Sequence, residues 1–199
     1  LGCGMAMSSI FLAKEFDIQV WATDLWIDAT SNLQRIREAG VEDRIFPIHA
    51  EAHALPFADG FFDAIISIDA YQYFGTDDLY APTVARLLKP DGQFGIAVPG
   101  LTHEIDEVPE HLEPWWEPDY WCFHSALWWQ RHLERSGVFT VDHAQEIPDA
   151  VKDWIRWDRA VRDHGFPNHL PPDPHTDQML EADAGRTIAL VEVVARNLS

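Results

Sequence analysis

The chain has 199 residues and a formal net charge of −19, from 33 acidic residues against 14 Lys and Arg. Such a surface repels phosphate backbones and anionic lipid, which argues against a nucleic-acid or membrane partner. No stretch reaches the ~20 continuous apolar residues of a membrane helix, and no basic-then-apolar segment indicates export. The two cysteines do not make a disulfide framework, so we expect a reducing, cytoplasmic setting.

The first hundred residues alternate between predicted helices and strands. In chain order they are a helix over 5–16, a strand over 18–24, a helix over 28–40, a short strand over 44–50, a strand over 62–68, a helix over 76–89 and a strand over 93–99. The continuous apolar run over 62–68 is typical of a strand buried on both faces of a parallel sheet. The alternation predicts an α/β fold with a doubly wound, mostly parallel sheet.

The second half begins with an acidic segment over 103–121 that holds three prolines, three tryptophans and no Lys or Arg. This composition predicts an irregular excursion. A helix with Ser125 as its N-cap follows over 125–137, and then come a strand over 138–147, a helix over 149–165, a Pro-rich loop over 166–174 and a closing strand over 187–197. We expect a single domain spanning 1–199.

A glycine turn and one acidic residue are the first candidates for a binding site. Gly2 and Gly4 lie where a strand would turn into the first helix, and glycine there lets the backbone approach a ligand. Asp24 ends the next strand, where a carboxylate can accept hydrogen bonds from both hydroxyls of a ribose. Alone, the pair fits a dinucleotide as well as it fits S-adenosylmethionine.

Four linked segments extend this pattern: LGCGMA at 1–6, ATD at 22–24, HAEAHALPFADGFFDAIISIDAYQYF at 49–74 and RLLKPDGQFGIAVP at 86–99. In order and spacing they resemble class I S-adenosylmethionine-dependent methyltransferases of the type 11 kind, over roughly residues 1–100. The resemblance implies a Rossmann-like sheet with an antiparallel last strand, S-adenosylmethionine as cofactor and a small-molecule methyl acceptor. It divides the chain into a cofactor-binding half (1–100), a Trp-rich substrate-side insert with helices and a strand (101–185) and a closing strand (186–199).

The resemblance also assigns residues to roles. It implies that the glycine loop passes the methionine and ribose end of the cofactor, that the acid ending the second strand holds the ribose, and that an acidic residue and alanine contact the adenine. The implied cofactor-binding residues are Gly2, Cys3, Gly4, Asp24, Leu25, Glu51, Ala52, Ser67 and Ile68.

A general base is needed only if the methyl acceptor arrives protonated. Asp69 and Tyr71 follow the strand over 62–68, at the edge where open α/β sheets bind ligands. His124 precedes a helix and could face the same crevice. These three residues are the candidate catalytic groups.

Two positions depart from the family pattern. Ala6 replaces a usual glycine, which is tolerable unless that residue needs a positive φ, so we expect a weaker or slightly shifted cofactor contact. Glu51 replaces the common Asp, which adds one methylene and leaves its rotamer less fixed. His49 and His53 run from a strand into a loop and do not share a helix face, so we expect no metal site.

Two other functions fit parts of this sequence. An NAD(P)-dependent oxidoreductase would usually carry Gly or Ala three residues after the second glycine, where this chain has Met7. A non-catalytic binding module could use the Trp-rich segment for a partner. Trp115, Trp116 and Trp121 could form a lid over an apolar or cationic acceptor, whereas Trp154 and Trp157 fit packing on a helix face.

The family's first strand precedes LGCG, and only Leu1 of it remains here. Loss of a central parallel strand exposes two unpaired edges. We therefore expect the sequence to be an N-terminally truncated piece of a longer protein, and these 199 residues alone to be poorly stable. Thermal unfolding followed by circular dichroism checks this expectation, and a cooperative, high-temperature transition would contradict it.

Overall fold

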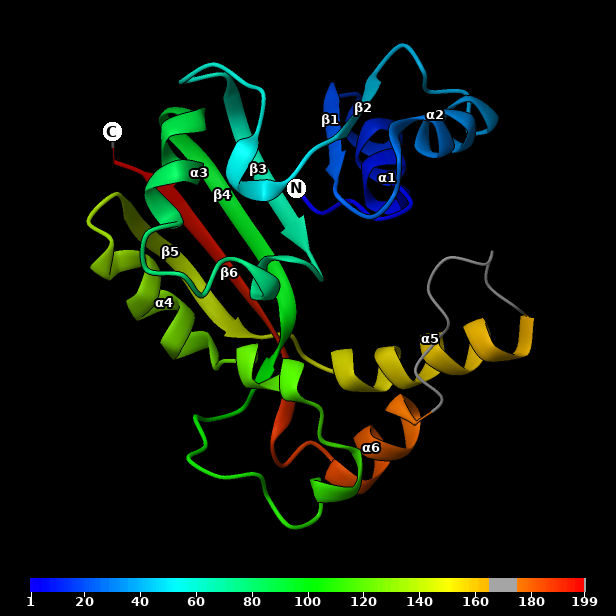
Figure 1. Cartoon of the computed structure of the whole chain (residues 1–199), viewed down its shortest axis with the longest axis vertical. Helices are drawn as coiled ribbons and strands as arrows, with labels where there is room; N and C mark the ends of the chain where they lie inside the picture. The colour runs from blue at the N-terminus through cyan, green and yellow to red at the C-terminus, as the bar shows by residue number, and fades with distance from the viewer. Residues whose placement is uncertain (165–174, 199) are drawn as a thin grey trace.

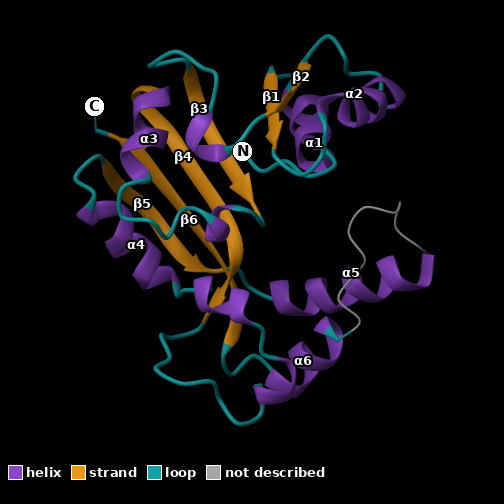
Figure 2. Ribbon diagram, in the orientation of Figure 1, coloured by secondary structure: helices purple, strands orange, loops and turns teal. Residues whose placement is uncertain are grey.

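Two sheets form the framework of the computed structural model, which describes residues 1–164 and 175–198. β1 (Val20–Asp24) and β2 (Ile45–His49) pair in parallel as a two-stranded sheet. The other sheet has the order β3-β4-β6-β5. In it β3 (Phe62–Ile68) lies parallel to β4 (Leu88–Leu101), and β6 (Ile188–Asn197) runs antiparallel to both β4 and β5 (Phe139–Glu146). The predicted α/β class with an antiparallel last strand is confirmed (Figures 1 and 2).

The helices divide between the two sheets. α1 (Met7–Phe16) and α2 (Ala29–Glu38) pack against β1 and β2, while α4 (Ala126–Arg135) packs against β5 and β6 and the short α3 (Ala81–Leu87) leads into β4. α5 (Ala150–His164) and α6 (Thr176–Asp183) pack against each other beyond the end of the larger sheet (Figure 1). None of the described helices is long and apolar enough to cross a membrane.

One predicted helix is shorter in the structure, and one helix was not predicted. The helix expected over 76–89 is only α3, because the chain first turns at Asp77, whose carboxylate accepts the Leu79 N–H, and Pro82 then occupies the first helical turn. From Leu88 the chain already pairs with β3. α6 had no prediction, and the Pro-rich loop expected over 166–174 lies outside the described residues.

β3 is not buried on both faces, so that expectation was wrong. Ile66 and Ile68 are 40% and 46% exposed. The exposed residues alternate with the buried Ile65 and Ser67, so one face of β3 is uncovered, and Ile66 and Ile68 line a cavity there. In addition, no strand among the described residues pairs with the facing edges of β1 and β3.

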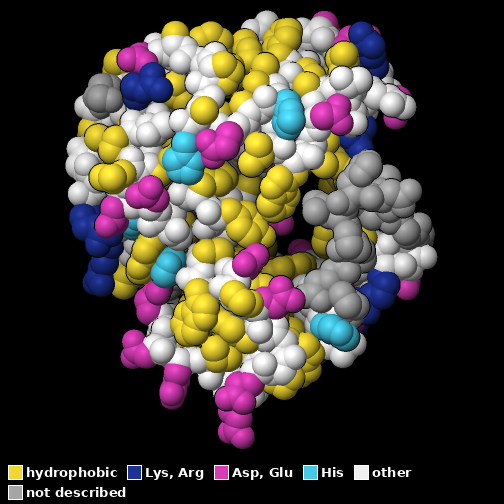
Figure 3. Space-filling view, in the orientation of Figure 1, with side chains coloured by type: hydrophobic (Ala, Val, Ile, Leu, Met, Phe, Trp, Pro, Cys, Tyr) yellow, Lys and Arg dark blue, Asp and Glu magenta, His cyan; other side chains and the backbone are white. Residues whose placement is uncertain are grey.

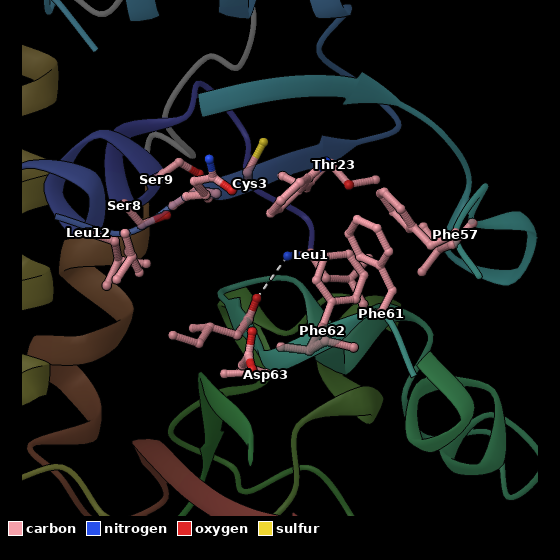
Figure 4. A pocket seen from close by; sticks show the side chains of 18 of the residues that line it. Leu1, Cys3, Ser8, Ser9, Leu12, Thr23, Phe57, Phe61, Phe62 and Asp63 are labelled. Carbon is pink, nitrogen blue, oxygen red and sulfur yellow. Dashed lines mark hydrogen bonds between the residues drawn. The ribbon is translucent and has the colours of Figure 1, made fainter. Parts of the chain in front are cut away.

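The first residues of the chain bridge these facing edges through backbone hydrogen bonds. The Leu1 ammonium donates to the Ile66 carbonyl at 2.8 Å, and the Cys3 N–H donates to the Thr23 carbonyl at 3.0 Å. Beside this bridge lies a cavity of about 640 Å³, with Leu12 on one side and Phe57, Phe61 and Phe62 on the other (Figure 4). Each edge therefore keeps backbone groups that no strand of the described chain satisfies.

The acidic excursion over 103–121 is irregular, as expected. Apart from two 3₁₀ turns, η3 (Glu113–Trp115) and η4 (Pro118–Cys122), it has no helix or strand. It is nevertheless packed, because Leu112 is buried in an apolar cluster with Leu180 and Ile188. This cluster anchors the excursion to α6 and to the start of β6.

One buried carboxylate fixes that junction. Asp183 is fully buried, and its oxygens accept the N–H groups of Thr187 (3.1 and 3.0 Å) and Ile188 (2.9 Å). His111 of the excursion lies 2.9 Å from the same carboxylate through Nε2. Burial alone would raise the pKa of Asp183, but the hydrogen bonds from His111, Thr187 and Ile188 together lower it.

We predict that Asp183→Asn destabilises the protein by about 2–3 kcal/mol, because its amide cannot accept all of these bonds in a buried site. The stability that ionised Asp183 contributes is present above about pH 4 and is lost as the pH falls through the lowered folded-state pKa. Urea unfolding at neutral and acid pH measures both effects. The exposed Asp106→Asn is the matched control, and an equal loss in both variants would contradict the prediction.

Candidate active site

The carboxyl ends of β1 and β3 lie on either side of the first loop of the chain. Thr23, which contacts Cys3, precedes the last residue of β1, and Ile66, which contacts Leu1, lies two residues before the end of β3. The loops that follow Asp24 and Ile68 therefore meet at one edge of the molecule. This edge of an open α/β sheet is where such folds bind ligands.

The loop over residues 1–6 turns through left-handed backbone. Gly2 and Gly4 have φ values of +66° and +52°. A Cβ on Gly2 would lie 2.3 Å from the Cβ of Ala70, so no larger residue fits there. Ser67 lies next to Gly2, and its buried Oγ has no hydrogen-bond partner. A glycine cradle beside an unsatisfied hydroxyl is a place where a ligand's polar atom can be received.

Asp24 holds this loop to the end of β1. Its Oδ2 accepts the Gly4 N–H at 2.7 Å, and its Oδ1 accepts the N–H groups of Trp26 (2.8 Å) and Ile27 (2.9 Å). A carboxylate offers about four acceptor positions. Three are used within the chain, so one position on Oδ2 is left, which suits one ribose hydroxyl rather than the two expected from the sequence.

A residue that the sequence did not single out holds the loop from the other side. Asn32 on α2 is buried, and its Nδ2 donates to the Gly4 carbonyl at 2.9 Å and approaches the Cys3 sulfur at 3.7 Å. The sequence signal that could have identified Asn32 was a polar residue next to the apolar face of the helix predicted over 28–40. Cys3 itself stays a thiol, because burial, with a smaller contribution from Asp24, raises its pKa to about 11.

Ala6 has a φ of +61°, so it does occupy the conformation in which alanine is strained. Its methyl group is fully buried among Ala13, Ala22 and Ile36, and this packing offsets part of the strain. Ala6 therefore has the positive φ at which we expected the replacement of glycine to be less tolerable.

Leu25 follows β1, and the two residues implied for adenine contact, Glu51 and Ala52, follow β2. Leu25 is half exposed, and its carbonyl lies 2.7 Å from His49 Nε2, which ties the ends of these strands together. Glu51 bonds the N–H and Nδ1 of His53, and the bond to the His53 side chain is the main cause that lowers the pKa of Glu51. Ala52 is buried, and its carbonyl accepts the Tyr80 hydroxyl at 3.0 Å.

Asp69 and Tyr71 diverge after β3. Asp69 turns at a φ of +53°, its Oδ1 accepts Gln72 Nε2 at 3.2 Å, and loss of hydration raises the pKa of its carboxyl. Tyr71 instead points into the core, where its ring packs 5.0 Å from Phe94 and 5.5 Å from Trp129 between ring centroids. Burial raises the pKa of Tyr71 far above its usual value. The structure does not bring Tyr71 to the open edge with Asp69.

The acidic excursion packs close to this edge, because its turn η4 contacts the 3₁₀ turn η2 (Tyr71–Tyr73), which follows β3. The exposed rings of Trp26 and Tyr73 lie 5.8 Å apart, which links the loops after β1 and β3. Burial first, and then the charges of Asp69 and of η4 residues, raise the pKa of Tyr73.

The exposure of the tryptophans differs in part from the expected pattern. Trp115 and Trp116 pack against the apolar cluster, so of the three expected lid residues only Trp121 is largely exposed, at 48%. Trp154 packs as expected, whereas Trp157 is half exposed.

His124 lies where the excursion rejoins the sheet. β4 continues four residues beyond Ala97, the partner of Ile68, and its last residue, Leu101, donates to the His124 carbonyl at 3.2 Å. The His124 Nδ1 lies 2.8 Å from a Glu104 oxygen. Among the described residues, no group of three or more His, Cys, Asp or Glu could hold a metal ion.

Comparisons with known proteins point to one family. A methyltransferase-domain family model matches residues 1–92. Methyltransferase GfsG of Streptomyces halstedii is 29% identical over 109 residues, which are 54% of this chain and 39% of that protein. The 2-methyl-6-phytyl-1,4-hydroquinone methyltransferase of Synechocystis is 27% identical over 181 residues, which are 83% of this chain and 55% of that protein.

The fold agrees with these matches. Phosphoethanolamine N-methyltransferase 2 of Haemonchus contortus, solved with S-adenosyl-L-methionine, superposes with a TM-score of 0.73 at 17% identity, covering 100% of this chain and 47% of that one. Residues 1–92 are therefore similar to a methyltransferase domain, and the whole chain shares its fold with solved methyltransferases. It spans about half the length of the curated relatives it matches.

We predict that Gly2→Ala is more damaging than Gly60→Ala. Both glycines have a positive φ, but a Cβ on Gly60 meets nothing within 4 Å, whereas a Cβ on Gly2 meets Ala70. Gly60→Ala should cost about 1 kcal/mol, from backbone strain alone, and Gly2→Ala should cost a further ~1–3 kcal/mol from overpacking. Chemical unfolding measures both values.

The double variant Gly2→Ala/Ala70→Gly serves as the test of mechanism. It removes the group that clashes, so it should recover the overpacking cost and leave only the backbone strain. No recovery in this variant would contradict the assigned contact.

Proposed function

We propose that the protein binds S-adenosylmethionine at the edge formed by the first loop and the ends of β1 and β3, and transfers its methyl group to a small-molecule acceptor. The observation that carries this proposal is the 2.7 Å bond between the Gly4 N–H and Asp24, which joins the glycine loop to the acidic strand end. The match of the methyltransferase-domain model to residues 1–92 supports it.

The residues at the edge fit this cofactor. In our proposal Gly2, Cys3 and Gly4 pass its methionine and ribose end, and Asp24 accepts one ribose hydroxyl. Ser67 Oγ is a buried group in need of a partner beside them. Further residues assigned to the cofactor are Leu25, Glu51, Ala52 and Ile68.

The cofactor supplies an electrophilic methyl group on a sulfonium, so the chain's own work is to align the acceptor and exclude water. Asp69 is held at the edge by Gln72 and can receive a polar group of the acceptor. His124, beyond the end of β4, is the candidate for taking a proton from it.

The charges around the edge limit the acceptor. The segments 1–6, 24–28, 49–55, 69–80 and 102–125 contain no Lys or Arg. Figure 3 agrees, because Lys and Arg lie toward the margins of that face whereas Asp and Glu also lie across its middle. An acceptor with a phosphate, such as the one named for the Haemonchus relative, would find no cationic partner in these segments. We therefore propose a neutral or cationic acceptor.

The acidic surface and the two free thiols support a cytoplasmic protein whose partner is a small molecule rather than nucleic acid or membrane.

Calorimetric titration tests the cofactor assignment. S-adenosylmethionine and S-adenosylhomocysteine should bind and NADH should not. Asp24→Asn should weaken S-adenosylmethionine binding by about 10–100-fold, because hydrogen bonds to a charged group are lost. The exposed Asp28→Asn, which preserves the N-cap of α2, should leave the affinity unchanged. Tight NADH binding without a response to either sulfur compound would end the proposal.

A screen of amines, phenols, carboxylic acids and phosphomonoesters then addresses the acceptor. Turnover should appear among amines or phenols, and turnover confined to phosphomonoesters or carboxylic acids would contradict a neutral or cationic acceptor.

A further inference from the structure

Glu104 makes two hydrogen bonds at the start of α4. Its Oε2 accepts from His124 Nδ1 at 2.8 Å, and its Oε1 accepts the Ser125 N–H at 2.7 Å. Burial alone would raise the pKa of Glu104, but the bonds from His124 and Ser125 hold it below the usual value, so the carboxylate is ionised at neutral pH. A carboxylate bonded to Nδ1 fixes the hydrogen on that nitrogen and leaves Nε2 as the basic atom.

The ring of His124 is also held by stacking. Trp128, one turn into α4, lies parallel to it with ring centroids 3.6 Å apart and an angle of 7° between the planes. The opposite face of Trp128 carries His132, at 4.5 Å and 12°. His132 in turn bonds the Gly75 carbonyl through Nε2 at 2.9 Å. The stack ties His124 to the loop that follows η2.

Backbone contacts bring the residues around His124 close to η2, which follows Asp69 at the proposed methyl-transfer edge. Leu101, the last residue of β4, bonds the His124 backbone, and η4, which ends two residues earlier, packs against η2. The His124 side chain keeps 19% of its surface exposed. The structure records a partner for its Nδ1, and records none for its Nε2 among the described residues.

We propose that Glu104 is a positioning residue that orients His124, and that His124 Nε2 accepts a proton from the methyl acceptor. The inference rests on the proposed function and deepens it, because it requires an acceptor that carries its proton on oxygen or nitrogen: a phenol, an alcohol or an ammonium group. With a phenol or an alcohol, Nε2 takes the proton as the oxygen bonds to the methyl carbon; with an ammonium group, Nε2 takes the proton first and the freed nitrogen lone pair then attacks. In both cases the methyl–sulfur bond breaks with its electron pair passing to sulfur.

The first test is spectroscopic and needs no acceptor. Long-range ¹H–¹⁵N spectra of the whole chain, with the His124 signals assigned through His124→Gln, report which ring nitrogen carries hydrogen. Above the titration of the ring, wild-type His124 should have hydrogen on Nδ1, and Glu104→Gln should abolish this preference. His143, which pairs with Glu192 on the strands, should keep its signals in both proteins.

The second test uses the acceptor found in the screen. His124→Gln should lower kcat by about 10²–10⁴-fold, as expected for loss of a general base, with unchanged affinity for S-adenosylmethionine. Glu104→Gln should shift the acidic limb of the pH–rate profile and lower kcat. His132, which stacks on Trp128 in the same group of rings and has a pKa lowered by burial, is the other titratable ring that could move this limb.

Two variants guard against a folding artefact. Glu110→Gln removes an exposed acid from the same excursion and should change neither the tautomer nor the profile. Glu104→Asp keeps the charge on a shorter side chain and should fall between wild type and Glu104→Gln. A purely structural Glu104 would lower the melting temperature and leave the tautomer and the profile unchanged.

Hydrogen on Nε2 of wild-type His124, or an unchanged pH profile in Glu104→Gln, would overturn the proposal. Failure of S-adenosylmethionine binding in calorimetry would instead overturn the proposed function, since neither Glu104 nor His124 is assigned to the cofactor.

Discussion

The bond between the Gly4 N–H and Asp24 is the contact on which the rest of the site depends. It joins a loop with little intrinsic order to the end of a strand, and the same carboxylate orders the turn through Trp26 and Ile27. Because the charge of Asp24 is met by three backbone donors, the acid can be nearly buried without a cationic partner. The loop position, the start of α1 and the ribose end of the proposed site all follow from this one carboxylate.

The same short loop also bridges the two sheets. Leu1 bonds β3 and Cys3 bonds β1, and a cavity rather than a paired strand occupies the space beside them. The carboxyl ends of β1 and β3 are therefore held by the backbone contacts of two residues and by the contact between the rings of Trp26 and Tyr73. A cofactor that contacted both Asp24 and Ser67 would add a link across the same gap, so ligand binding and sheet stability are coupled in this chain.

The sequence was sufficient wherever a signal is local. The turn at Gly2 and Gly4 and the position of Asp24 at the end of β1 could be predicted, because glycines and strand-end acids occur at characteristic places in the sequence, and α4 could be predicted from Ser125 and its helical pattern. The burial of β3 could not be predicted, because it depends on what packs against the strand. The contacts of Asn32 and Glu104 could not be predicted for the same reason, because their partners lie 28 and 20 residues away in the sequence. Tyr71, in an aromatic run, gave no local sign that it points into the core.

These long-range contacts assign a role to the acidic excursion. Its composition indicates a solvated loop, yet Leu112 anchors it in a buried cluster and His111 meets Asp183 at the start of β6. Two further contacts close the excursion where it rejoins the sheet. Glu104, near its start, accepts the Ser125 N–H, and Leu101 donates to the His124 carbonyl. An irregular backbone can then hold His124 at a defined place before α4, as a helix or strand would, because its ordering entropy is offset by packing elsewhere.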